Sequence, residues 1–263
     1  MKPEVFALAL SLPLTASAQS APPGYDAILS AVARPSGVDV SALRARVAGV
    51  QRAHQWLATH GPTATPAAYP SRDARLAYWI NAYNLTVLRG IAEAPASMDN
   101  LLTYRPASGF FRRDTWRVDG RALTLDAIEN SEVRAVFHDP RVHVALNCGA
   151  RSCPPLRATP YTAEHLSREL DAQATRWVNA PGSVRVDEEA HRVTVSQLFE
   201  WFADDLAGPI PGHASTAARG PLAFVYAYAS PTLRASLTRA CGADARRCAV
   251  SHAPYDWSLA RAR

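Results

Sequence analysis

The chain has 263 residues, a net charge of +5 and 48% hydrophobic residues, which suffices for one large domain with a substantial core. Its basic residues are scattered, with no basic stripe interleaved with aromatic residues, so the composition argues against nucleic acid as a partner. No segment beyond the N-terminal region approaches eighteen consecutive apolar residues, so we expect no transmembrane segment.

The first 18 residues have the pattern of an export signal. Lys2 supplies a short charged region, residues 5–14 are mostly apolar, and Ala-Ser-Ala at residues 16–18 fits a cleavage site. The apolar part is too short to span a bilayer. We therefore predict a signal peptide over residues 1–18 and a periplasmic or secreted mature protein.

Residues 19–70 are predicted to form an N-terminal helical extension. Apolar residues at helical spacing indicate a helix over residues 43–59, and a proline-rich loop follows. Ser71 opens a strong helical pattern that continues to about residue 92, with Pro95 just beyond its end. We expect residues 71–263 to form the main domain, in one compact unit with the extension.

The central segments indicate short strands and helices. The Asp-Gly pair at residues 119–120 suits a tight turn in a hairpin, and Thr124 is placed to cap a helix over residues 125–136. Residues 141–147 have the apolar character of a buried strand, which leads into a loop with two cysteines.

The C-terminal third continues this mixture. The predicted elements are a helix over 163–179 capped by Thr162, a hairpin from 184–186 and 192–195, a helix capped by Ser196 that continues to 206, and a helix over 231–240. Because helices and antiparallel strands alternate without a βαβ rhythm, we predict an α+β fold. We expect a single domain with several helices packed on a small, mainly antiparallel sheet.

Residues 143–155, HVALNCGARSCPP, place two thiols, an imidazole and an amide beside a glycine turn. Cys148 and Cys153 are compatible with a disulfide, with buried structural thiols, or with a nucleophile whose pKa is lowered by its surroundings. In a regular strand His143 and Cys148 point to opposite faces, so Cys153 is better able to meet His143. The five-residue spacing matches no usual zinc motif, so we predict no metal and no other cofactor.

Other polar residues have two possible roles each. Asn81 and Asn84 lie one turn apart on the most apolar helix, where they either brace a loop or orient a substrate. Glu129 is either an ordinary exposed glutamate or a general base or orienting carboxylate. Cys241 and Cys248 flank a polar turn and are expected to form a disulfide.

The chain resembles the family called domain of unknown function 547 (DUF547). The matching blocks are YWINAYN at 78–84, LTLDAIE at 123–129, the segment 139–155, YTAE at 161–164, FEWFADD at 199–205 and YDWSL at 255–259. They extend over most of the chain in a specific order, so residues 71–263 are expected to be the family domain. The family's name supplies little about function.

The resemblance bears on the cysteines. The family also occurs in intracellular plant proteins, where a disulfide rarely persists. A permanent disulfide therefore explains Cys148 and Cys153 less well, and thiol chemistry is favoured. Cys241 and Cys248 lie outside the matching blocks, which agrees with a local disulfide. Some exported relatives resemble accessory envelope proteins, which keeps a noncatalytic role open.

The sequence thus predicts an exported thiol-dependent hydrolase or acyltransferase acting on an amide or cell-envelope substrate, either a small molecule or a peptide. Cys148 or Cys153 is the nucleophile and His143 is the base. Glu129 or Asn147 orients the imidazole.

The same hypothesis assigns binding groups. Backbone amides of residues 149–152 are expected to bind the oxyanion, and Asn81, Asn84 and Arg151 are candidate substrate contacts. The alternative is a noncatalytic envelope binding or scaffolding domain whose cysteines are structural.

Overall fold

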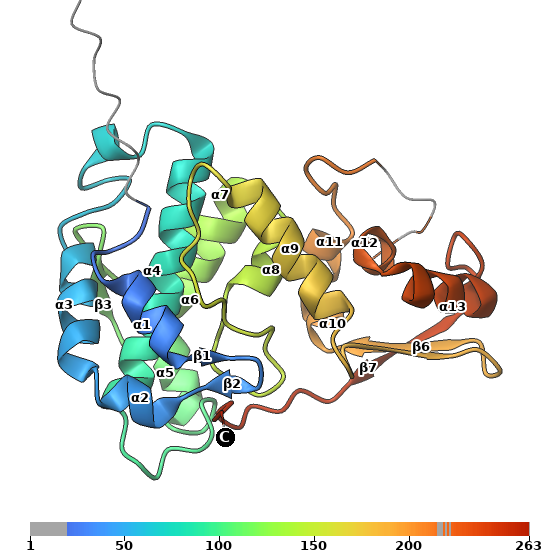
Figure 1. Cartoon of the computed structure of the whole chain (residues 1–263), viewed down its shortest axis with the longest axis horizontal. Coiled ribbons are helices and arrows are strands. Elements are labelled where there is room, and N and C mark those ends of the chain that lie inside the picture. The colour runs from blue at the N-terminus through green and yellow to red at the C-terminus, as the bar shows by residue number, and fades with distance from the viewer. Residues whose placement is uncertain (1–19, 215–217, 219, 221, 263) are drawn as a thin grey trace, which may run out of the picture.

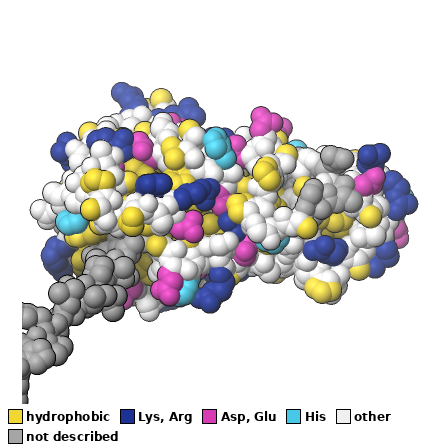
Figure 2. Space-filling model, turned by 90° about the horizontal axis from the view of Figure 1, so that it is seen from above, with side chains coloured by type: hydrophobic (Ala, Val, Ile, Leu, Met, Phe, Trp, Pro, Cys, Tyr) yellow, Lys and Arg dark blue, Asp and Glu magenta, His cyan; other side chains and the backbone are white. Residues whose placement is uncertain are grey.

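The computed structural model describes residues 20–214, 218, 220 and 222–262, so the predicted signal peptide over 1–18 lies outside the described residues. The described chain extends along one axis, with its N-terminal half at one end and its C-terminal helices and strands at the other (Figure 1). Figure 2 shows basic and acidic side chains interspersed over one face, without a continuous basic stripe on that face.

The N-terminal half packs around α4 (Arg72–Glu93). The Ser71 side chain caps this helix by accepting a hydrogen bond from the Ala74 N–H at 3.0 Å, as the sequence predicted. Nearly every residue of α4 from Leu76 onward is buried, which is typical of a helix at the centre of a core.

Three further helices belong to the predicted N-terminal extension. They are α1 (Tyr25–Val32), α2 (Val40–Arg44) and α3 (Val47–Leu57). Helices α2 and α3 pack against α4, and α1 packs on both of them. A short hairpin, β1 (Ala33–Arg34) and β2 (Gly37–Val38), connects α1 to α2.

The predicted hairpin near residue 119 is confirmed as β3 (Trp116–Val118) and β4 (Arg121–Leu123). Asp119 and Gly120 have φ values of 54° and 74°, which a two-residue hairpin turn requires. The short elements before it are η1 (Pro66–Ala68), η2 (Pro106–Ser108) and α5 (Gly109–Arg112).

Thr124 caps the next helical run, as predicted, by accepting a hydrogen bond from the Ala127 N–H at 3.0 Å. The run consists of α6 (Leu125–Ala127), the π-helical segment η3 (Ile128–Arg134) and α7 (Ala135–Phe137). A π-helical turn is uncommon and often occurs at functional sites, because it redirects side chains that a regular helix would place elsewhere. Here it carries Glu129 and Arg134.

The elements of the second half are α9 (Leu166–Val178), β5 (Val184–Asp187), β6 (Arg192–Ser196), α10 (Leu198–Trp201), α11 (Ala203–Leu206), α12 (Leu222–Tyr228), α13 (Pro231–Cys241) and β7 (Ala249–Ala253). Strands β5 and β6 form the predicted antiparallel hairpin, and β7 pairs with β6 in parallel. The α+β class is confirmed, although the strands are divided among three small sheets.

Two helix starts differ from the predictions. Helix α9 begins at Leu166, and the Thr162 N–H donates instead to the Glu169 carboxylate at 2.8 Å. Ser196 accepts a hydrogen bond from the Leu198 N–H at 3.3 Å, but the helix it starts is interrupted at Phe202.

The predicted strand over residues 141–147 is wrong. Residues Val142–Ala145 form a single helical turn, α8, and the chain becomes extended only at Leu146. The segment is apolar because it is buried on every side, and a short apolar run does not distinguish a strand from a buried helix. The expectation that His143 and Cys148 face opposite sides of a strand is therefore wrong as well.

Asn84 holds the end of α8 against α4. Its amide nitrogen donates to the Ala145 carbonyl at 3.0 Å, and its amide oxygen accepts from the Asn147 N–H at 2.7 Å. One buried side chain thereby satisfies both backbone groups that the end of the helical turn leaves free.

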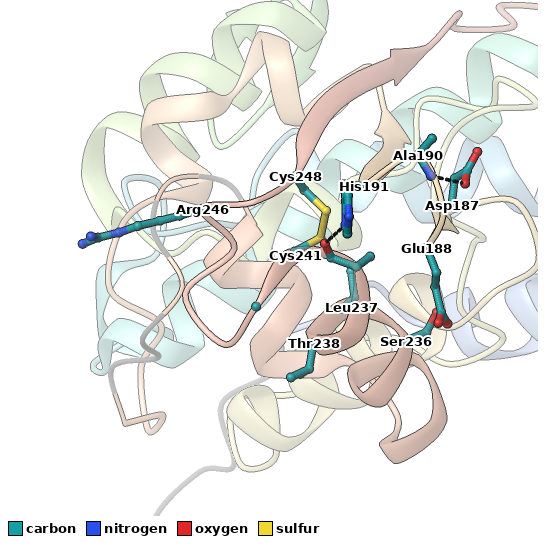
Figure 3. The surroundings of a disulfide bond; sticks show 12 residues. Asp187, Glu188, Ala190, His191, Ser236, Leu237, Thr238, Cys241, Arg246 and Cys248 are labelled. Atoms are coloured by element: carbon teal, nitrogen blue, oxygen red, sulfur yellow. Dashed lines mark hydrogen bonds between the residues drawn. A yellow bond between two sulfur atoms is a disulfide. The ribbon is translucent and has the colours of Figure 1, made fainter.

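Cys241 and Cys248 form the predicted disulfide, which links the end of α13 to the start of β7 (Figure 3). Nearby, the His191 ring nitrogen Nδ1 bonds to the Ala240 carbonyl at 2.7 Å, and Glu188 bonds to Ser236 and Arg239 of α13. These contacts attach α13 to the β5–β6 turn.

The buried apolar side chains form two clusters. The first surrounds α4, and the second lies among α9, α10, α12, α13 and β6. They meet at α8, where Val144 belongs to the second cluster while Val142 and Ala145 belong to the first. The C-terminal segment returns to this junction, because Leu259 forms a bridge with Ala150 in the cysteine loop.

Within the described residues, no helix has both the length and the apolar character needed to cross a bilayer.

We expect Asn84→Ala to lower the free energy of unfolding by about 2–4 kcal/mol, because it leaves a buried carbonyl and a buried N–H without partners. Equilibrium unfolding in urea measures this change. Arg75→Ala, on the exposed side of the same helix, is the matched control and should change stability by about 0.5 kcal/mol or less. Equal effects of the two substitutions would contradict the bracing role.

Candidate functional site

A cavity of about 450 Å³ lies at the junction of the two hydrophobic clusters. Its walls are formed by α4, η3, α8, the cysteine loop, α10 and the C-terminal segment. Four of the residues predicted from the sequence line it together, namely Cys148, Cys153, His143 and Glu129. A cavity of this size accommodates a small-molecule ligand or part of a larger one.

Cys148 and Cys153 are both free thiols and both partly exposed. The backbone N–H of Cys148 donates to the Cys153 sulfur at 3.1 Å. The Cys148 sulfur in turn lies 3.3 Å from the Tyr255 hydroxyl, which comes from the C-terminal segment. The two thiols therefore form one group with Tyr255 and do not belong to a structural disulfide.

The two thiols have opposite acidities. The pKa of Cys148 is lowered, because the Cys153 thiol and the Tyr255 hydroxyl donate hydrogen bonds to its sulfur and outweigh the cost of burial. Burial, and then the neighbouring Cys148 sulfur, raise the pKa of Cys153. Cys148 is thus the thiol that ionises first and the stronger candidate nucleophile.

Glu129 lies on η3 and faces the same cavity. The Tyr83 hydroxyl donates to its carboxylate at 3.2 Å. Burial raises the pKa of Glu129, which favours the protonated acid. Burial raises the pKa of Tyr83, and negative charge on Glu129 and on both sulfurs raises it further.

His143 is held by groups other than the cysteines. Its Nε2 lies 2.8 Å from an Asp205 carboxylate oxygen, and its ring stacks on Phe202 with centroids 4.1 Å apart. The same Asp205 oxygen accepts a hydrogen bond from Arg134 at 2.7 Å. The Arg134 guanidinium lies over the same Phe202 ring, 4.6 Å from its centroid.

The imidazole of His143 is nearly inaccessible, since only 1% of its side-chain surface is exposed. Burial lowers its pKa, so the ring is neutral and donates its Nε2 proton to Asp205. Hydrogen bonds from His143 and Arg134 hold the pKa of Asp205 well below its usual range. This group forms a rigid part of the cavity wall.

Aromatic rings form another part of the wall. Trp201, Tyr255 and Trp257 contact one another with centroids 4.7–5.8 Å apart, and Phe111 packs on Trp257 at 5.9 Å. Trp201 remains 45% exposed at the surface. A flat or apolar group of a ligand can therefore pack against these rings.

The amides predicted as candidate substrate contacts brace the backbone. Asn81 makes hydrogen bonds to both the carbonyl and the N–H of Tyr161, at 2.8 and 3.0 Å. Asn147 donates to the Pro154 carbonyl and accepts from the Gly149 N–H. Asn81, Asn84 and Asn147 do not line the cavity, which agrees with the bracing alternative and not with substrate contact or orientation of the imidazole.

The predicted oxyanion site in residues 149–152 is not available. The N–H of Gly149 donates to Asn147, that of Arg151 to the Ser258 carbonyl, and that of Ser152 to the Asp256 carbonyl. The Ala150 N–H is directed at the Cys148 sulfur. The C-terminal segment covers this loop, and the loop amides therefore form hydrogen bonds to that segment or to the Cys148 thiol.

Arg151 lies outside the cavity. It is exposed and pairs with Asp256 at 3.3 Å. With Asn147 and Ser152 it lines a second cavity of about 330 Å³ on the other side of the cysteine loop. Cys153 and Tyr255 line both cavities and form part of the partition between them.

Sequence reasoning missed three residues of the site, Tyr83, Asp205 and Tyr255. Each lies in one of the blocks that resemble the DUF547 family, which was the available signal. Their roles depend on contacts over long sequence separations, such as the one between Cys148 and Tyr255, and no local pattern reports these. In the part of the chain that the structure describes, no three His, Cys, Asp or Glu side chains are arranged to hold a metal ion.

Comparison with known proteins gives one match. Residues 68–178 match the family described as "Protein of unknown function, DUF547". No curated protein and no solved structure matches the chain. The matched region includes α4, η3 and the cysteine loop, which supply most of the polar groups of the cavity. The chain therefore contains a region of the DUF547 family over residues 68–178.

Proposed function

We propose that this protein is a thiol-dependent hydrolase or acyltransferase with Cys148 as its nucleophile. The observation that carries the proposal is that Cys148 lines a cavity of about 450 Å³, where its sulfur is hydrogen-bonded to the Tyr255 hydroxyl and its pKa is lowered. A thiolate stabilised by donors needs no separate base to become nucleophilic.

In the proposed first step the Cys148 thiolate attacks the carbonyl carbon of an amide or ester. The carbon–sulfur bond forms, and the carbonyl electron pair moves to oxygen. The Tyr255 hydroxyl, which binds the sulfur at rest, is the donor beside this developing charge. Collapse of the intermediate breaks the bond to the leaving group and gives a thioester on Cys148.

Glu129 supplies the proton for the leaving amine. Its raised pKa favours the acid that this step needs, and Tyr83 holds the carboxyl group in place. The resulting carboxylate then takes a proton from water, or from another acceptor, as that molecule attacks the thioester. Release of the acid or transferred acyl product restores the Cys148 thiolate and protonated Glu129.

His143 and Asp205 act as positioning residues in this proposal. Their mutual hydrogen bond and the ion pair with Arg134 fix the wall that faces the thiols. The inaccessible imidazole is less suited to accept a proton from a substrate than the sequence suggested. Because His143 lines the cavity, we expect the shape of the site to depend on its side chain.

The proposed substrate is an amide or ester with a flat or apolar group that packs on Trp201, Tyr255 and Trp257. A small molecule or peptide of the cell envelope fits the exported character expected from residues 1–18. The Cys241–Cys248 disulfide supports an oxidising compartment, either periplasmic or extracellular.

We expect p-nitrophenyl acetate to acetylate Cys148, because its activated carbonyl suits a resting thiolate. Rapid mixing should show a burst of p-nitrophenolate, and mass spectrometry should place the acetyl group on Cys148. Cys148→Ser should abolish the burst, whereas Cys153→Ser, which keeps a hydrogen-bond donor, should retain it. Thiols that react only after unfolding would instead support a noncatalytic binding or scaffolding domain.

Glu129→Gln should keep the burst but slow steady-state turnover of the same ester by about 10²–10⁴-fold, because water loses its general base. The acetyl-enzyme should then accumulate in the mass spectrum. Asp126→Asn is the matched control, since Asp126 lines the same cavity beside Arg112. A similar slowing in both variants would argue against a specific role for Glu129.

The pH dependence of alkylation by iodoacetamide reports the acidity of Cys148. Because only the thiolate reacts, the rate rises with pH through the pKa, and we expect a midpoint below that of an unperturbed cysteine thiol. Tyr255→Phe removes a donor to the thiolate, so the pKa of Cys148 rises and the midpoint should move to higher pH. Tyr104→Phe, away from the thiols, should not move it, and an unshifted midpoint in Tyr255→Phe would refute the assigned donor.

A further inference from the structure

We propose that Cys148 and Cys153 also form a redox pair, in which Cys148 attacks a small-molecule disulfide and Cys153 resolves the mixed disulfide. This activity goes beyond acyl transfer, although it shares the nucleophile Cys148 with the proposed function. Hydrolysis gives no reason for a second thiol at this position, because a hydroxyl group would serve equally as a hydrogen-bond donor.

The fold of the loop brings the two sulfurs together. The Cys153 N–H donates to the Ala150 carbonyl at 3.0 Å, which turns the chain back toward Cys148. The Cys153 sulfur then accepts a hydrogen bond from the Cys148 backbone N–H at 3.1 Å, and its thiol donates to the Leu146 carbonyl at 3.7 Å. A disulfide requires closely placed cysteines, and this loop supplies that arrangement.

Gly149 makes the tight return possible. Its φ of +83° is a conformation that side chains disfavour, and an added Cβ would approach Ile91 to 2.8 Å. The loop backbone at Gly149 thus packs closely against α4, while both cysteines line the cavity. The pair is held in place without being bonded.

A disulfide substrate can reach the pair. Both cysteines are partly exposed residues and line the cavity of about 450 Å³, whose aromatic wall suits a flat substituent. Cys153 also lines the second cavity, of about 330 Å³. Solvent therefore has a route to Cys153 while a substrate group occupies the first cavity.

The proposed exchange has two steps. The Cys148 thiolate attacks one sulfur of the substrate disulfide, forms a mixed disulfide and expels the other sulfur as a thiolate. Cys153 then loses its proton to solvent and attacks the Cys148 sulfur, which expels the second substrate thiolate and leaves a Cys148–Cys153 disulfide. Two electrons pass from the protein dithiol to the substrate, which is the oxidant.

The acidities agree with this division of roles. Cys148 has the lowered pKa that an attacking thiol needs at neutral pH. The pKa of Cys153 is raised partly by the adjacent Cys148 sulfur. Once Cys148 is in a mixed disulfide its charge is gone, so this contribution disappears and Cys153 ionises more readily.

The test uses the folded wild-type protein and the aromatic disulfide 5,5′-dithiobis(2-nitrobenzoate). We expect release of two equivalents of thionitrobenzoate, a transient adduct on Cys148, and a final product without adduct in which peptide mapping finds Cys148 joined to Cys153. The Cys241–Cys248 disulfide should be unchanged and serves as the internal control. Stable adducts on both thiols, or a first adduct on Cys153, would overturn the proposal.

Two variants sharpen the result. Cys153→Ser should release one equivalent and retain the adduct on Cys148, because nothing resolves it. Cys148→Ser should react at least about tenfold more slowly, since burial, the largest cause of the raised Cys153 pKa, still keeps that thiol mostly protonated. Resolution at the wild-type rate in Cys153→Ser would contradict the assigned role.

Failure of this proposal and failure of the hydrolase proposal are distinguishable in wild-type protein. An acetyl burst on Cys148 together with two stable thionitrobenzoate adducts would remove the redox pair alone. Complete formation of the Cys148–Cys153 disulfide without any acetylation would remove acyl transfer alone.

Discussion

The site depends on the two hydrogen bonds that the Asn84 amide makes across the junction of the two hydrophobic clusters. They fix α8 and the cysteine loop to α4, most of whose residues are buried. Since both backbone partners are buried, water cannot replace the Asn84 side chain as their hydrogen-bond partner. The position of Cys148 is thus set by a helix more than sixty residues earlier in the sequence, and its chemistry is set by groups from the rest of the chain.

Several elements followed from local rules. Thr124 caps the helix that it was expected to cap, the helix expected to open at Ser71 begins there, and Asp119-Gly120 forms the expected hairpin turn. The Cys241–Cys248 disulfide was predictable because its loop is short and polar. Each of these features is decided by residues close together in sequence, where turn geometry and capping chemistry are sufficient.

The conformation of residues 141–147 and the partners of the polar groups in the site could be determined only from the tertiary structure. The segment 141–147 is apolar because neighbours surround it, and that burial permits a helical turn as readily as a strand. The roles of His143 and the loop amides changed for the same reason. His143 is bonded to Asp205, and the amides of residues 149–152 are bonded to Asn147, to the C-terminal segment or to a sulfur. No sequence spacing indicates which partner a buried polar group will find.

The contact between Cys148 and Tyr255 spans 107 residues, and it has a consequence for biosynthesis. During vectorial synthesis the cysteine loop emerges long before the segment that contains Tyr255. Until that segment docks beside Ala150, Cys148 lacks one of the donors that stabilise its thiolate, and the cavity lacks much of its aromatic wall. The nascent chain therefore carries its sulfur in a less acidic and less reactive form, and completion of the fold is itself the step that activates it.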